Sequence, residues 1–91
     1  MYNTYANFGY AILKAYTKDH HPVQDAIDFM VAHCKDARWD IVSKAMKTME
    51  EGFKKKQPYT CQLVEWTRRE MEHQFRQDMI YYTICYDGFR L

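Results

Sequence analysis

Hydrophobic residues recur every three or four positions along most of the chain, which is the spacing of one face of an α-helix. The clearest run has spacings of 3, 4, 3 and 4, as in a seam that packs against a neighbouring helix: Trp39, Val42, Met46, Met49 and Phe53. Three lysines follow it, Lys54, Lys55 and Lys56, and positive charge suits the free carbonyls of a helix C-terminus. We therefore predict a helix that ends near Lys56.

Two shorter helices are predicted before this one. Residues 3–17 place one apolar face on Tyr5, Phe8, Ile12, Ala15 and Tyr16. Pro22 is well placed at the first position of the next helix, where its missing N–H is not needed. The apolar stripe of that helix consists of Val23, Ala26, Ile27, Met30, Val31 and Cys34.

A fourth helix is predicted from Pro58, with its apolar stripe on Val64, Met71, Phe75, Met79 and Tyr82. Its charged residues are expected in solvent: Glu65, Arg68, Arg69, Glu72 and Arg76. Residues 79–86 are ambiguous, because β-branched and aromatic residues also suit a strand, and Asp87-Gly88 is a turn signal. A strand would need a partner, so we favour a continued helix of roughly 28 residues, about 42 Å long.

These elements predict an all-α fold: one domain over residues 1–91, a compact three- or four-helix orthogonal bundle with a long C-terminal helix. Only 3 glycines and 2 prolines interrupt the chain, which favours long regular elements over a many-turned β fold. The predicted core comprises Phe8, Ile12, Val23, Ile27, Met30, Val31, Trp39, Val42, Met46, Met49, Phe53, Leu63, Met71 and Phe75.

Charge and cysteine content narrow the function classes. The 13 basic and 12 acidic residues give a net charge of +1, which argues against a nucleic-acid mimic and against a strongly basic packaging protein. Three cysteines, an odd number, do not form the framework of a secreted disulfide-rich domain. We find no leader-like start and no apolar run of about 20 residues, so we expect a cytoplasmic protein with no membrane segment.

The sequence contains no complete motif of a known catalytic or metal site. No segment matches a motif that is specific enough to name a family. His33 and Cys34 are neighbours in a helix and point about 100° apart, so they cannot act together as base and nucleophile. Glu70 and His73 have the spacing used in di-metal helical bundles, but the motif occurs once. His20 and His21 are expected in a solvated loop. We predict no enzyme activity, no cofactor and no metal.

Six basic residues form a candidate nucleic-acid-binding ridge on the last two helices: Lys54, Lys55, Lys56, Arg68, Arg69 and Arg76. Glutamates interleave with them, and Glu65–Arg69 and Glu72–Arg76 are favourable pairs one helical turn apart. We favour the simpler interpretation, a salt-bridged solvent face, and keep nucleic-acid binding as the alternative function.

Aromatic residues are the main functional clue, because the chain has 8 Tyr, 5 Phe and 2 Trp, more than a thin core buries easily. Exposed Tyr and Trp are typical of binding hot spots, although tyrosines can also line a bundle with their hydroxyls in water. The leading hypothesis is a non-enzymatic protein-interaction module, an accessory subunit or an inhibitor of the phage or mobile-element type that acts by steric occlusion. Its partner would be another protein or a second copy in a homodimer, and its contact residues would be Tyr81, Tyr82, Tyr86 and Phe89. A small-molecule or nucleotide sensor with aromatic stacking in a dimer interface ranks below the interaction module and the nucleic-acid-binding protein.

Overall fold

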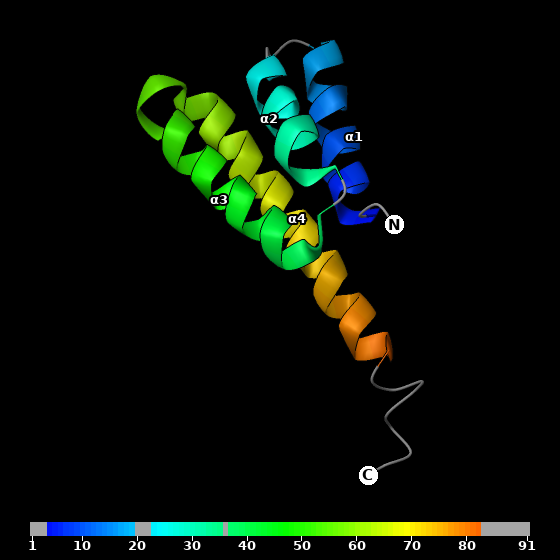
Figure 1. The fold of residues 1–91 in the computed structure, drawn as a ribbon. Helices are drawn as coiled ribbons and strands as arrows, with labels where there is room; N and C mark the ends of the chain where they lie inside the picture. Colours follow the sequence, from blue (N-terminus) through cyan, green and yellow to red (C-terminus); the bar gives the residue numbers. More distant parts are fainter. Residues whose placement is uncertain (1–3, 20–22, 36, 83–91) are drawn as a thin grey trace.

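The computed structural model describes residues 4–19, 23–35 and 37–82, and within them it contains four α-helices and no strand. The helices are α1 (Thr4–Asp19), α2 (Gln24–Cys34), α3 (Trp39–Lys56) and α4 (Pro58–Tyr82). Consecutive helices run antiparallel, and the orange end of α4 extends past the other three (Figure 1). The predicted all-α bundle with a long last helix is confirmed.

Helix α4 packs against α3 along one side and against α1 along another. Pro58 is its first residue, as predicted, and the helix runs for 25 residues, about 37 Å. Residues 79–82 are helical, which decides in favour of the continued helix up to Tyr82. The remainder of the ambiguous segment lies outside the described residues.

The core lies between all four helices and confirms most of the predicted positions: Val23, Ile27, Met30, Val42, Met46, Met49, Leu63 and Met71 are buried. Four of these side chains are methionines, which are unbranched and fill irregular gaps between helices. Trp39 and Phe53 pack against the core from its edge. The apolar face that the residue spacing predicts for α3 is therefore the face that α3 buries.

The buried face of α1 is not the one that the sequence predicted. Ala6, Gly9 and Leu13 are buried, whereas Phe8 is 38% exposed and Ile12 is partly exposed. The physical reason is close packing: a Cβ atom at Gly9 would collide with the Sδ and Cε atoms of Met71. Helices can approach this closely only where a small residue lies between them, so Gly9 faces Met71, and Phe8 and Ile12 lie at the rim.

Val31 is a second correction to the predicted core, because its side chain is 47% exposed. The buried positions of α2 are Ala26, Ile27, Met30 and Cys34, a narrower stripe than the one predicted. Val31 lies beside that stripe and lines an open hollow of about 290 Å³ between α1 and α2, together with Ala6 and Tyr10.

Candidate interaction surface

The projecting end of α4 carries exposed apolar side chains. Ile80 is 60% exposed and Tyr81 is 67% exposed, and the preceding residue, Met79, is also exposed. Neighbours in a helix point about 100° apart, so these side chains cover more than one side of α4. Of the predicted contact residues, Tyr81 lies on this end and Tyr82 is its last residue, while Tyr86 and Phe89 lie outside the described residues.

An aromatic cluster fixes the point at which α4 leaves the bundle. The rings of Tyr5, Trp39 and Phe75, from α1, α3 and α4, have centroids 5.5 to 5.8 Å apart. The hydroxyl of Tyr5 donates a hydrogen bond of 2.5 Å to Asp78, which also accepts one of 3.0 Å from Gln74. Partial burial, together with the hydrogen bond and negative charge of Asp78, raises the pKa of Tyr5 to about 12. The start of α1 is therefore held against α4 one turn before the projecting end.

The outer face of α4 is a continuous exposed stripe, here called the outer stripe: Gln62, Trp66, Arg69, His73, Arg76 and Ile80. Its residues are separated by 4, 3, 4, 3 and 4 positions, the spacing of a helix-pairing seam. Two ion pairs join the arginines of the stripe to glutamates beside it. Arg69 lies 2.6 Å from Glu65, and Arg76 lies 3.7 Å from Glu72, and both pairs join residues one turn apart in the same helix. The expected salt bridges on this face are present.

A shallow hollow of about 240 Å³ opens at the other end of the outer stripe. Its walls on α4 are formed by Tyr59, Gln62, Leu63 and Trp66, and Tyr16 of α1 closes one side. The Tyr16 and Trp66 rings meet edge to face with centroids 5.9 Å apart. Residues 59, 62, 63 and 66 have the spacing of the four residues that surround a hole between two turns of one helix face.

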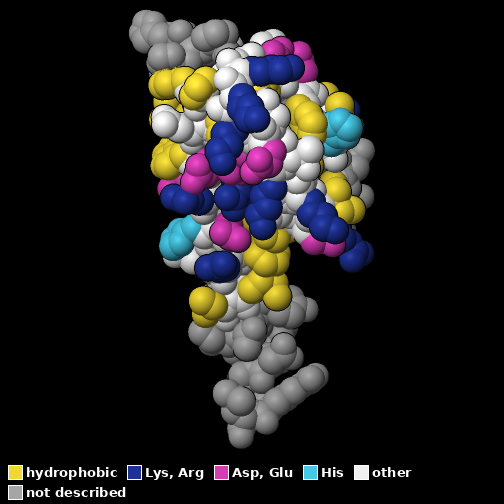
Figure 2. All heavy atoms as spheres, turned by 90° about the vertical axis from the view of Figure 1, so that its left-hand side faces the viewer, with side chains coloured by type: hydrophobic (Ala, Val, Ile, Leu, Met, Phe, Trp, Pro, Cys, Tyr) yellow, Lys and Arg dark blue, Asp and Glu magenta, His cyan; other side chains and the backbone are white. Residues whose placement is uncertain are grey.

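The six predicted basic residues do not form one patch. Lys54, Lys55 and Lys56 end α3 beside the start of α4, whereas Arg76 lies eighteen residues after Pro58, about 27 Å along the helix. Basic and acidic side chains alternate over the face that α3 and α4 form (Figure 2). This alternation supports the simpler interpretation of a salt-bridged solvent face.

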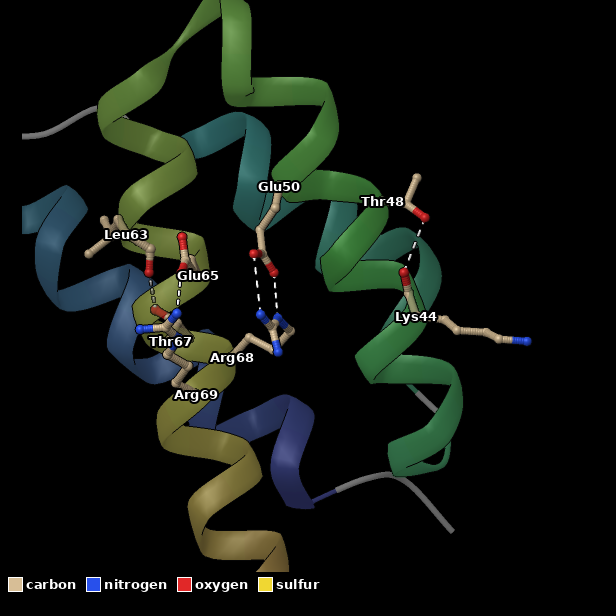
Figure 3. Close-up of polar contacts among 8 residues, drawn as sticks. All are labelled: Lys44, Thr48, Glu50, Leu63, Glu65, Thr67, Arg68 and Arg69. Carbon is tan, nitrogen blue, oxygen red and sulfur yellow. Dashed lines mark hydrogen bonds and ion pairs between the residues drawn. The ribbon is translucent and has the colours of Figure 1, made fainter.

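Arg68 differs from the prediction that it is solvated. Its guanidinium group reaches across from α4 to Glu50 of α3 and donates hydrogen bonds of 2.5 Å from Nε and 3.4 Å from Nη2 (Figure 3). Both side chains are largely buried, with 14% and 13% of their surface exposed. The hydrogen bond from Arg68 to Glu50 is the main cause that raises the pKa of this arginine. Arg68 thus joins two helices and has little freedom to contact a phosphate.

The described residues include a buried thiol and no metal-binding cluster. Cys34 is buried, and that burial raises the pKa of its thiol to about 11, so it is protonated at neutral pH. Across residues 4–19, 23–35 and 37–82, no three His, Cys, Asp or Glu side chains are grouped to hold a metal ion. Glu70 and His73 are both exposed, and His20 and His21 lie outside this part of the chain. Within the same ranges, none of the helices offers the continuous apolar stretch that a membrane span requires.

Comparison with known proteins adds no assignment: no family model, no curated protein and no solved structure matches the chain.

Proposed function

We propose that the protein is a non-enzymatic interaction module that docks the projecting end of α4 onto a protein surface. The observation that carries this proposal is the exposure of Ile80 and Tyr81 on a helix end beyond the bundle. Isolated exposed apolar residues are common on proteins, but adjacent large ones on a projecting helix are costly to leave in water. Tyr81 adds a rigid amphipathic ring of the kind enriched in interface hot spots.

The way the end of α4 is held supports the same function. The cluster of Tyr5, Trp39 and Phe75, with the hydrogen bond from Tyr5 to Asp78, fixes the helix axis just before the projecting residues. A fixed helix loses less conformational entropy on binding than a flexible tail does. Such a module would act by covering part of its partner's surface, which is how a small accessory subunit or inhibitor works without chemistry of its own.

Nucleic-acid binding remains the second proposal, with less support. Arg68 is engaged by Glu50, and Arg69 and Arg76 lie beside glutamates of their own helix. Lys54, Lys55 and Lys56 are exposed at the end of α3, and Glu51 lies one helical turn before Lys55.

Position-specific crosslinking tests the interaction function. A photoreactive phenylalanine analogue at Tyr81 should give a discrete protein adduct in cells that express the protein, and one at exposed Lys47 should not. Ile80→Asp should remove most of this adduct. Ile41→Asp is the matched control, because Ile41 is a 53% exposed isoleucine on α3. Equal labelling from positions 81 and 47, or an adduct indifferent to Ile80→Asp, would refute the proposal.

A further inference from the structure

We propose that the surface that receives the end of α4 is the outer stripe of a second copy of this chain, the two α4 helices lying antiparallel. This inference rests on the proposed function and names its partner. It is drawn from three features of α4: the projecting Ile80, the hollow near its start, and the order of charges between them.

The hollow fits Ile80 by position. Two paired helices insert each seam residue into a hole formed by four residues of the facing helix at positions i, i+3, i+4 and i+7. Tyr59, Gln62, Leu63 and Trp66 form such a hole, and it is open and about 240 Å³ in volume. Ile80 lies on the same outer stripe near the opposite end of α4, so an antiparallel copy brings it to this hole. A two-fold axis then fills both hollows at once.

Placing Ile80 in this hole determines which residues of the two outer stripes face each other along the rest of the pair. With Ile80 opposite Gln62 of the second copy, moving four residues along both helices places Arg76 opposite Trp66 of that copy. A further three residues place His73 opposite the second copy's Arg69. The guanidinium of Arg76 then lies against an exposed indole ring, an arrangement favourable for a cation and an aromatic face.

The two ion pairs along the stripe are self-complementary in this register. Their order is Glu65, Arg69, Glu72, Arg76, so reversing the helix exchanges each of these four charges for its opposite. Arg76 of one copy meets Glu65 of the other, and Arg69 meets Glu72, each contact occurring twice across the axis. Like charges would face one another if the helices were parallel and in register, so the pattern selects the antiparallel pair.

A charge-swap experiment tests the proposal. One variant carries Glu65→Arg and Glu72→Arg, which makes these four positions all positive, and the other carries Arg69→Glu and Arg76→Glu, which makes the same four positions all negative. Light scattering after size exclusion should give the unmodified protein twice the mass of the 11.1 kDa chain. Each variant alone should be a monomer, because four ion pairs replaced by like-charge contacts raise the dissociation constant by at least about tenfold. An equimolar mixture should return to the dimer mass, since all four pairs form again between unlike chains.

The outcomes separate this inference from the proposed function. Unmodified protein that stays monomeric up to about 1 mM overturns the dimer, whether or not the variants fold. Variants that still dimerise alone, or a mixture that stays monomeric although circular dichroism shows both chains helical, overturn the register. If the dimer fails but the residue at position 81 crosslinks to a different protein, the interaction function stands with a foreign partner. If neither association is found, both fall.

Discussion

Gly9 offers a sharp test of how closely α1 approaches the rest of the bundle. A methyl group added at this position meets the Sδ and Cε atoms of Met71, with Cε of Met30 at 3.2 Å. The second described glycine, Gly52 of α3, has no atom within 4 Å of the same added methyl. Gly9→Ala and Gly52→Ala are thus the same chemical change inside two helices, and they differ in the space available.

The expected magnitudes follow from two opposing effects. Glycine to alanine in a helix interior stabilises by about 1 kcal/mol, because alanine has fewer unfolded conformations to lose. Overpacking a well-filled core costs about 1–3 kcal/mol, and the lower half of that range applies because the obstructing atoms end a flexible side chain. Gly52→Ala should therefore stabilise the protein by about 1 kcal/mol. Gly9→Ala should leave the stability unchanged or lower it by about 1 kcal/mol.

Thermal and urea unfolding followed by circular dichroism measure both variants. The two melting temperatures should differ by at least about 4–8 °C, the shift that 1 kcal/mol produces in a domain of this size. The slope of the urea transition should stay constant, showing that the denatured state is unchanged. If Gly9→Ala raises the melting temperature as much as Gly52→Ala does, α1 does not lie against Met71 as described.

Three further predictions concern the contacts that join the helices. Glu50→Gln should lower the free energy of unfolding by about 1–3 kcal/mol, and adding Arg68→Met should cost less than the two changes separately, which a double-mutant cycle measures. Because burial raises the pKa of Cys34 from 9.0 to about 11, stability is fully retained below pH 9 and falls as the pH rises to 11. Cys34→Ala should flatten that decline in urea titrations. Tyr5→Phe should cost about 1 kcal/mol and remove a tyrosine ionisation near pH 12 from an absorbance titration.

The fold could be predicted where one face of a helix was clearly more apolar than the others. In α3 the spacing of Val42, Met46 and Met49 left no competing face, and these residues are buried. In α1 two faces overlap, since Phe8 and Ile12 are next to Gly9 and Leu13. Hydrophobicity favours the first face. Packing favours the second face, because only a glycine at position 9 leaves room for Met71, and this contact joins residues more than sixty positions apart.

The candidate surface could be predicted in part. The exposure of Ile80 and Tyr81 follows from a difference in length: α4 has 25 residues and its neighbour α3 has 18, so about 10 Å of α4 has no helix beside it. The helix lengths predicted from the sequence for α3 and α4 already differ in the same way. The ion pair of Arg68 with Glu50 could not be found in the same way. Pairs within one helix follow from spacing alone, whereas a pair between helices requires their relative register.

Oxidation of the core methionines can report how often the helices of this protein separate. Met30, Met46, Met49 and Met71 are 0–3% exposed, whereas Met79 is 50% exposed on the projecting end of α4. A mild peroxide therefore converts Met79 to its sulfoxide directly, but reaches the buried thioethers only when the helices separate. Each sulfoxide adds one oxygen atom to the mass. A mass spectrum of partly oxidised protein therefore distinguishes oxidation at the exposed Met79 from oxidation of the core, which requires unfolding. Oxidative damage in the cell would follow the same order, altering the projecting end before it reaches the fold.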